Sequence, residues 1–299
     1  MAEAGHSKRL RYFSEYLLVR LLFVMFGILS LDGASALGGW LGRKIGPRLK
    51  LNRRAAKNLA MAMPEIDMTE RERILDGMWG HLGRVFAEYP HLGTFDPYNP
   101  DDDHLVVQNS DIVERLRNDG IGGIFFSAHI GNWELGALGA TRRGMTLGQL
   151  YRPANNARVD RLIMAARTPI GGDYQPKSGS GLRSLMAMLK RGNHLAIMAD
   201  QRYNEGIAVP FFGCKAMTAP TIAELALRYR VPVVPARIVR LHGAHFRLEF
   251  EEPLALPNSG NKQQDVLTVM TDVNARFEAW IREYPEQWLW VHRRWSKEN

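Results

Sequence analysis

The feature that most constrains the fold is an alternation of apolar runs with amphipathic segments over the C-terminal two thirds of the chain. Helical periodicity at Ser110–Asn118 precedes the apolar run Gly123–Ser127, and another helix is expected to begin near Asn132. Strands and helices that alternate in this way are typical of a sheet flanked by helices. We therefore predict the α/β fold class, with a central mixed sheet.

The same patterns recur along the rest of the chain. Further strands are expected at Thr146–Tyr151, His194–Ala199, Pro232–Val239 and His245–Glu251, and further helices at Ala157–Ala166, Leu182–Lys190, Ala219–Arg228 and Gln263–Glu283. Upstream, residues 52–91 have the periodicity of two helices separated by Met63-Pro64, and the polar segment Thr94–His104 predicts a loop.

The N-terminal region differs in composition from the rest. An apolar stretch runs from Leu21 to Trp40, is interrupted by Asp32 and has basic residues on both sides. Its length approaches the roughly 20 residues of a membrane span, but a carboxylate is costly in lipid. A tilted span and an interfacial helix both stay open, and a cleaved signal peptide or a buried helical hairpin are weaker alternatives. We predict a membrane-associated helix, with residues 1–50 as an attachment segment and residues 51–299 as the main domain.

The charge of the chain narrows the choice of partner. Its formal charge is +8 and its pI is about 9.7, which favours an anionic partner. Nucleic acid is the weakest candidate, because no recognition motif accompanies the charge. More basic residues follow the apolar stretch than precede it, which favours a cytoplasmic C-terminal domain.

Cys214 is the single cysteine and indicates a structural thiol in a reducing compartment. We expect neither a metal nor a cofactor.

His129 and Glu134 are the strongest candidates for chemistry. On one continuous helix, residues five positions apart would point roughly 140° away from each other. The preceding apolar run instead places His129 in the turn after a strand and Glu134 in the first turn of a helix, so that the carboxylate can reach back to the imidazole. A histidine held in this way can act as a general base. Backbone N–H groups near Gly131 and Asn132 would support negative charge on an attacked carbonyl.

The spacing of these two residues also has a simpler interpretation. His129 would cap a helix, and Glu134 would interact favourably with the helix dipole. An isolated His/Glu pair is a weak motif, so spacing alone leaves both interpretations open.

Several longer blocks of sequence resemble one family. Ser127–Leu135 resembles the H-x4-D/E block of the lysophospholipid acyltransferase superfamily, and in particular that of the late acyltransferases of bacterial lipid A biosynthesis. Tyr151–Asn156, Asp200-Gln201 with Val209–Gly213, and Pro285–Trp295 resemble later blocks of that family. The resemblance extends over roughly residues 54–295.

This resemblance implies a function for the named residues. It implies transfer of a lauroyl- or myristoyl-type group from acyl carrier protein to a hydroxyl of a phosphorylated lipid A precursor at the cell inner membrane. His129 would be the base and Glu134 its orienting partner. Substrate-binding roles would fall to five further residues: Asn132, Arg152, Arg183, Asp200 and Gln201. Of these, Arg152 and Arg183 would lie near the donor or the phosphate, and Asp200-Gln201 would border the site.

Other functions are compatible with parts of the sequence. A glycerophospholipid acyltransferase or an acyltransferase of phosphatidylinositol mannosides would use the same base and partner. A non-catalytic basic protein docked on anionic membranes would explain the charge and the apolar stretch, but not the His/Glu block. Phe211-Phe212 would either line an acyl channel or belong to the core.

Overall fold

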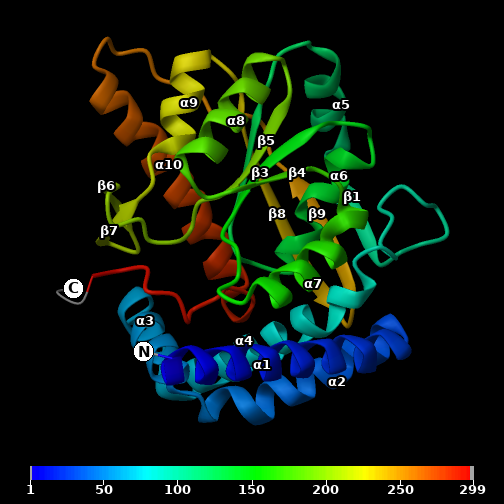
Figure 1. Cartoon of the computed structure of the whole chain (residues 1–299). Helices are drawn as coiled ribbons and strands as arrows, with labels where there is room; N and C mark the ends of the chain where they lie inside the picture. The colour runs from blue at the N-terminus through cyan, green and yellow to red at the C-terminus, as the bar shows by residue number, and fades with distance from the viewer. Residues whose placement is uncertain (1, 297–299) are drawn as a thin grey trace.

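A seven-stranded sheet forms the centre of the molecule (Figure 1). The computed structural model describes residues 2–296, with side chains from residue 8 onward. The predicted attachment segment, residues 1–50, and the predicted main domain, residues 51–299, therefore each extend slightly beyond the described residues, by Met1 and by residues 297–299. The strand order is β1-β9-β8-β2-β5-β3-β4, and β6 and β7 form a separate hairpin. The strands are β1 (Leu105–Gln108), β2 (Ile124–Ser127), β3 (Leu147–Tyr151), β4 (Asp173–Pro176), β5 (His194–Met198), β6 (Ile207–Phe211), β7 (Cys214–Thr218), β8 (Val233–His242) and β9 (His245–Phe250).

The directions of the strands decide which loops meet. β2 is parallel to both β5 and β8, and β3 is parallel to β4 and β5. β8 turns back antiparallel into β9, and β1 is parallel to β9. The sheet is therefore mixed, as predicted. The carboxyl ends of β2, β5 and β8 lie at the same end of the sheet as the beginnings of β1 and β9.

Alternate residues of β2 enter two different cores. Ile124 and Phe126 belong to one buried cluster, whereas Phe125 belongs to the other. Because successive side chains of a strand point to opposite faces, an apolar run without polar interruption predicts a strand covered on both faces. The first cluster includes residues of helices α8 (Gly179–Lys190), α9 (Thr221–Tyr229) and α10 (Lys262–Glu283). The second includes residues of α5 (Ser110–Asn118) and α6 (Leu138–Thr141).

Helices account for most of the remaining chain. The α-helices are α1 (Ala2–Ile28), α2 (Leu31–Ile45), α3 (Lys50–Ala62), α4 (Met68–Glu88), α5 (Ser110–Asn118), α6 (Leu138–Thr141), α7 (Ala157–Arg167), α8 (Gly179–Lys190), α9 (Thr221–Tyr229) and α10 (Lys262–Glu283). The 3-10 helices are η1 (Gly46–Arg48), η2 (Tyr89–His91), η3 (Trp133–Ala137), η4 (Thr168–Ile170) and η5 (Pro285–Gln287). Every expected helix is present, and the one after His129 is divided into the short η3 and α6.

A helical segment begins near Asn132, as expected, but it is short. Only the five-residue η3 and the four-residue α6 follow His129. Gly136 and Gly139 lie within them, and glycine has a low helix propensity. Gly139 also packs tightly: a Cβ there would lie 2.5 Å from the side chain of Leu248. The macrodipole of such short helices is small. The start of this segment would therefore give less support than expected to negative charge on an attacked carbonyl.

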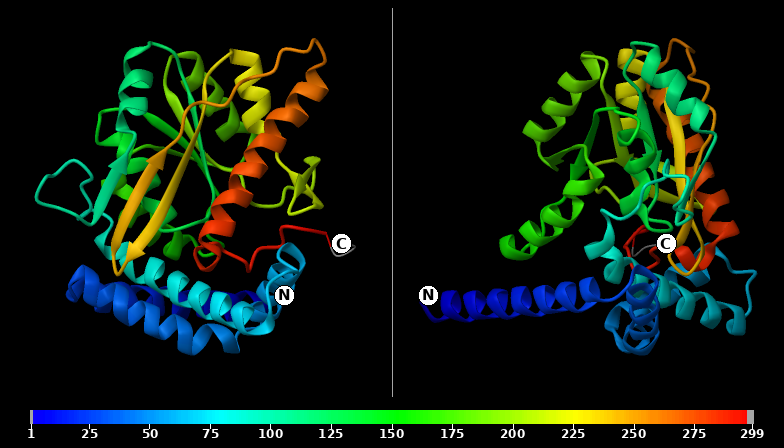
Figure 2. Two further views of the ribbon diagram at one scale, coloured as in Figure 1. Left: turned by 180° about the vertical axis from the view of Figure 1, so that it is seen from behind. Right: turned by 90° about the vertical axis from the view of Figure 1, so that its right-hand side faces the viewer.

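The N-terminal helices form a layer at the end of the sheet where β8 turns into β9 (Figures 1 and 2). α2 packs closely on α4 because both helices carry glycine at the contact; a Cβ on Gly38 would lie 2.5 Å from the carbonyl oxygen of Gly83. Ser35 of α2 also donates a hydrogen bond of 2.7 Å to the buried Glu88 of α4. α2 is therefore an integral part of this helical layer.

α1 extends beyond the rest of the molecule (Figure 2, right). Apolar side chains along it are exposed, namely Leu10, Phe13, Leu17, Leu18, Leu21, Val24 and Ile28. Phe26 is buried, and its carbonyl oxygen is 2.9 Å from Nε2 of His91, so the C-terminal end of α1 is anchored. Among the described residues, no helix combines the length and apolar content needed to cross a membrane.

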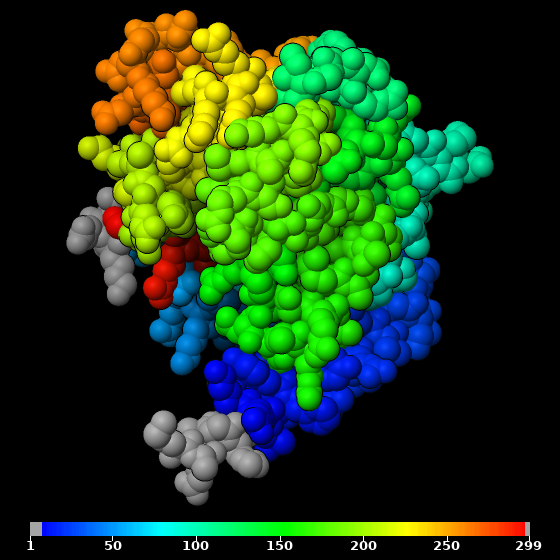
Figure 3. Space-filling model, turned by 45° about the horizontal axis from the view of Figure 1, so that its top comes forward, coloured from blue at the N-terminus to red at the C-terminus, as the bar shows by residue number. Residues whose placement is uncertain are grey.

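The predicted loop at Thr94–His104 leads into β1 and protrudes from the surface (Figure 3). Its turns are stabilised by side chains: Asp102 accepts hydrogen bonds from the N–H groups of Asp96 and His104, at 3.2 and 3.0 Å. Polar residues that satisfy nearby backbone groups are the reason such segments form turns rather than helices.

Candidate active site

Two neighbouring strands bring His129 and Asp200 together. His129 follows β2 and Asp200 follows β5, and the last residues of these parallel strands, Ser127 and Met198, are paired. His129 Nδ1 lies 2.7 Å from one carboxylate oxygen of Asp200, and the backbone N–H of His129 donates to the other at 3.0 Å. Trp288 Nε1–H donates to that second oxygen at 2.8 Å. Asp200 is thus fixed by three hydrogen bonds.

The charges of this pair support each other. Burial acts to raise the pKa of Asp200, but the charge and hydrogen bonds of His129 outweigh it and hold that pKa well below its ordinary value. Burial acts to lower the pKa of His129, yet the negative charge of Asp200 leaves it above its ordinary value. Asp200 therefore stays ionised and stabilises a protonated His129, while Nε2 is the atom available to take a proton.

The predicted contact between Glu134 and His129 is wrong. Glu134 instead forms a bidentate ion pair with Arg167, with both nitrogen–oxygen distances 2.7 Å, and accepts a hydrogen bond of 2.6 Å from Tyr89. The guanidinium is a stronger competitor for the carboxylate because it offers two parallel donors. His129 is held from the other side by Asp200, although the charge of Glu134 also contributes to raising the pKa of His129.

Gly131 allows the chain to turn between His129 and Glu134. Its φ is +56°, and a Cβ at this position would lie 2.2 Å from the carbonyl oxygen of Ile238. Its own carbonyl oxygen is 2.9 Å from Nε2 of His81. Burial and the charge of Arg240 lower the pKa of His81 to about 3, so its ring is neutral. Since Arg240 donates to Nδ1 of His81 at 3.1 Å, the ring Nε2 carries the proton and donates to Gly131.

The buried ion pair between Arg240 and Glu88 contacts the turn that contains Gly131 and Asn132. Arg240 donates to both oxygens of Glu88, at 2.5 and 3.0 Å, and Asn132 donates to Glu88 at 2.8 Å. The side-chain oxygen of Asn132 in turn accepts the N–H of Glu134 at 3.3 Å. Asn132 is completely buried, so it positions the turn in this structure and has no surface for a substrate.

A cavity of about 420 Å³ opens beside His129. Of the predicted site residues, His129, Glu134, Arg152 and Gln201 line it; Asp200 lies behind His129, and Arg183 is exposed on α8 outside the lining. The other residues that line it are Trp133, Gln149, Leu150, Tyr151, Arg167, Tyr174, Lys177, Ile197, Met198, Ala199, Arg202, Tyr203, Ala219, Thr221 and Ile222. A second hollow, of about 730 Å³ against α9, shares no lining residue with it.

Gln201 occupies the position beside the proton-accepting nitrogen. Its side-chain nitrogen lies 3.2 Å from Nε2 of His129 and 3.0 Å from Nε2 of His292. The sequence did not single out His292, although it lies in the C-terminal block, or Arg167, which no motif marks.

The C-terminal aromatic residues belong to the core. Trp288, Trp290 and Trp295 are buried, and the ring centroids of Phe211 and Trp295 are 5.4 Å apart. Phe211 and Phe212 are buried among these tryptophans and do not line the cavity. Cys214 is a free, partly buried thiol at the start of β7.

The chain is similar to known proteins over nearly all of its length. Residues 2–297 match the family model of bacterial lipid A biosynthesis acyltransferases. The chain is 24% identical over 285 residues to a lipid A biosynthesis acyltransferase of Haemophilus influenzae, covering 92% of this chain and 84% of that protein. Two Escherichia coli proteins are similarly related: a lipid A biosynthesis myristoyltransferase (25% identity; 84% and 77% coverage) and a lauroyltransferase (24%; 83% and 81%).

Proposed function

Because the chain belongs to the bacterial lipid A biosynthesis acyltransferase family, we propose that it moves a fatty acyl group from acyl carrier protein to a hydroxyl of a lipid A precursor, with His129 as general base and Asp200 as its orienting partner. The single observation that carries this mechanism is the hydrogen bond of 2.7 Å between His129 Nδ1 and the buried Asp200. It engages Nδ1 and leaves Nε2 to accept a proton, and His129 lines the cavity.

The reaction needs no nucleophile from the protein. The acceptor hydroxyl displaces the Gln201 amide from His129 Nε2 and gives up its proton as its oxygen attacks the carbonyl carbon of the acyl thioester. Asp200 stabilises the imidazolium that forms, and the proton then passes to the departing thiolate. Glu134 and Arg167 border the same cavity and shape it through their ion pair.

Basic residues at the cavity suit phosphorylated or acidic partners. Arg152, Lys177 and Arg202 lie in its lining. Arginine can hold a phosphate through two parallel hydrogen bonds, whereas lysine provides a point charge. Arg152 is the best placed of the predicted arginines to bind the phosphate of the acceptor. The role predicted for Arg183 is a separate proposal, because this residue is outside the lining.

The exposed apolar side chains of α1 suit a membrane surface. Basic residues lie on the same helix, including Lys8, Arg9, Arg11 and Arg20. Exposed apolar area and basic charge both favour binding to the interface of anionic membranes. We infer that the protein docks on the cytoplasmic face of the inner membrane, where an insoluble acceptor and a soluble carrier protein can both reach the cavity.

Mass spectrometry of lipid A tests the proposal directly. Cells that contain the protein should yield lipid A carrying one more fatty acyl chain than cells without it. The mass difference also identifies the chain. An unchanged lipid A, accompanied by a shift in the acylation of glycerophospholipids, would instead support the lysophospholipid alternative.

A further inference from the structure

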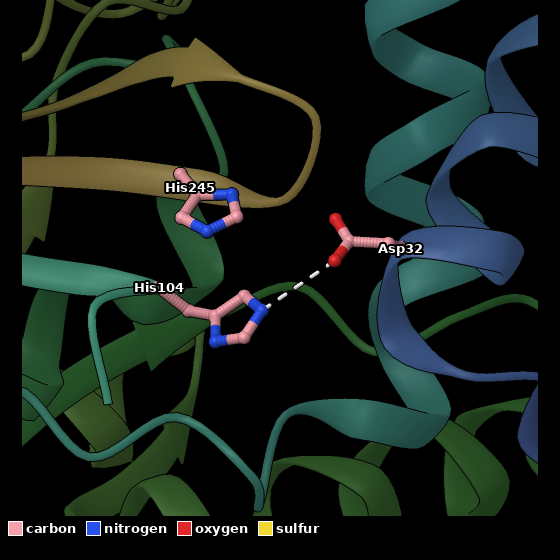
Figure 4. Close-up of side chains that lie close together, drawn as sticks. All are labelled: Asp32, His104 and His245. Atoms are coloured by element: carbon pink, nitrogen blue, oxygen red, sulfur yellow. Dashed lines mark ion pairs between the residues drawn. The ribbon is translucent and has the colours of Figure 1, made fainter. Parts of the chain in front are cut away.

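Three metal-ligating side chains meet outside the cavity, where α2 approaches the edge of the sheet (Figure 4). Asp32 is in the first turn of α2, His104 precedes β1 and His245 is the first residue of β9. One ligand atom from each lies within 4.8 Å of the other two. We propose that Asp32, His104 and His245 bind a divalent transition-metal ion, with Zn²⁺ as the ion that best suits them.

The distances are close to those of a metal site. His104 Nε2 lies 3.7 Å from one carboxylate oxygen of Asp32. His245 Nδ1 is buried and makes no hydrogen bond within the described part of the chain. Tetrahedral zinc with bonds of about 2.0–2.1 Å places its ligand atoms about 3.3 Å apart. Movements of about 1 Å, within the range of side-chain rotation, would therefore complete the coordination.

Neighbouring groups already orient two of the ligands. Asp102 lies 2.7 Å from Nδ1 of His104, which directs Nε2 toward Asp32. The other oxygen of Asp32 accepts the N–H of Ala244 at 3.3 Å. In zinc sites, a ligating histidine commonly donates its second ring N–H to a carboxylate, which fixes its tautomer and increases its basicity. Asp102 is the carboxylate that would fix the tautomer of His104 in this way.

The types of ligand select the class of ion. Two imidazoles and one carboxylate suit zinc and related transition metals, whereas Mg²⁺ and Ca²⁺ prefer ligands that are all oxygen. Asp103, whose carboxylate lies 3.3 Å from His245 Nε2, brings further negative charge to the cluster. A fourth ligand position would be open to water, because the part of the chain that the structure describes supplies three members.

The proposed ion would link two parts of the fold. Asp32 belongs to the N-terminal helical layer, whereas His245 begins β9 and His104 lies directly before β1. β1 and β9 run opposite to β2, so the cluster lies at the same end of the sheet as His129, and β8 is the strand between β9 and β2. Bound metal would thus fix the helical layer to the catalytic end of the sheet. This site could not be predicted from the sequence, because its three residues are far apart along the chain.

The test uses the full chain, purified without a polyhistidine tag and stripped of metal with a chelator. Isothermal titration with Zn²⁺ should give one equivalent bound. Co²⁺ should give the visible absorption of a four-coordinate nitrogen–oxygen site. The temperature of unfolding should rise with either ion, since binding to the folded state alone stabilises that state.

Matched variants locate the binding. His104→Ala and His245→Ala should each lose the tight site, whereas His242→Ala, the neighbouring exposed histidine, should retain it. Asp102→Asn keeps the size of the side chain and should weaken binding by about 10- to 100-fold, as expected when the group that orients a ligand is altered. His129→Ala should bind Zn²⁺ normally, which separates this site from the catalytic histidine.

Two results would overturn the proposal. The first is the absence of stoichiometric Zn²⁺ binding by the wild-type protein. The second is unchanged binding in both His104→Ala and His245→Ala. If either alanine variant is unfolded, Asp102→Asn is used in its place. An undiminished affinity of folded Asp102→Asn for Zn²⁺ would equally contradict the site.

Discussion

Asp200 determines how the activity should depend on pH. A general base must be unprotonated, so the rate should fall as pH drops through the pKa of His129, which lies above its ordinary value because of the charge of Asp200. In Asp200→Asn this charge is lost. We predict that the acidic limb of the pH–rate profile moves to lower pH and that the maximal rate falls by about 10²- to 10⁴-fold.

The matched control for this prediction is Glu134→Gln. Glu134 contributes less than Asp200 to the raised pKa of His129, so its removal should move the acidic limb less. The test is to measure kcat/KM against pH for both variants and to compare the positions of their acidic limbs. A larger movement in Glu134→Gln than in Asp200→Asn would show that Glu134, and not Asp200, is the partner of His129 during the reaction.

Gly131 gives a second prediction at this scale. Gly131→Ala would bring a methyl group against the carbonyl oxygen of Ile238 and would hold alanine at a positive φ. Such overpacking typically costs about 1–3 kcal/mol, and the displaced turn should also impair transfer. Gly136→Ala is the control, because a Cβ there meets nothing within 4 Å. Urea unfolding of both variants tests this; equal stability would contradict the tight contact.

The residues of the site could be predicted only in part from the sequence. The apolar run before His129 correctly placed it after a strand. The sequence predicted Glu134 as the partner of His129 and not Asp200, because Asp200 is distant in sequence and becomes a neighbour only through the pairing of β2 with β5. The ion pair of Glu134 with Arg167 likewise depends on how α7 is placed.

At the scale of elements, this ion pair fixes the end of α7 against η3. The Glu134 side chain is 4% exposed, so removal of its partner would leave a buried, incompletely paired carboxylate. We predict that Arg167→Met lowers the free energy of unfolding by roughly 3–5 kcal/mol. The double variant Arg167→Met with Glu134→Gln should recover part of that loss. If the two effects simply add, the side chains do not interact as described.

Elements with strong periodicity were predicted well, and short edge elements were not. α5 has the predicted bounds, and α7, α8, α9 and α10 differ from prediction by a few residues at most. β4 and β6 were missed because each contains proline, which disfavours a strand interior. β7 and β1 were also missed: apolar and polar residues alternate only weakly in β7, and β1 is only four residues long. Their pairing with neighbouring strands overrides these local preferences.

At the scale of the whole molecule, α1 should provide much of the attachment to membranes. We predict that Leu17→Ser, Leu18→Ser and Leu21→Ser together weaken binding to anionic phospholipid vesicles by more than about 100-fold, because each buried leucine contributes roughly 1.5 kcal/mol or more. The matched control changes Val106, Ile121 and Leu241, which are exposed on the α/β body, to serine. Equal binding by the two triple variants would place the attachment elsewhere.

The division of the chain at residue 50 stays a prediction, and truncation can test it. A chain that lacks residues 1–45 should lose vesicle binding. Because α2 packs on α4 through glycines and contributes Ser35 to the buried Glu88, we also expect this truncation to lower the unfolding temperature. A truncated protein that unfolds at the wild-type temperature would show that α2 adds nothing to the stability of the domain.

The most direct test of the mechanism is transfer by purified His129→Ala, measured with acyl carrier protein as donor and a lipid A precursor as acceptor. His129 is at the cavity and its ring is held by Asp200, so its loss should remove the base while leaving the core intact. We predict a fall in kcat of about 10²- to 10⁴-fold, together with a lower temperature of unfolding, because the buried carboxylate of Asp200 loses its partner. Turnover close to the wild-type rate in the folded variant would contradict the role of His129 as general base.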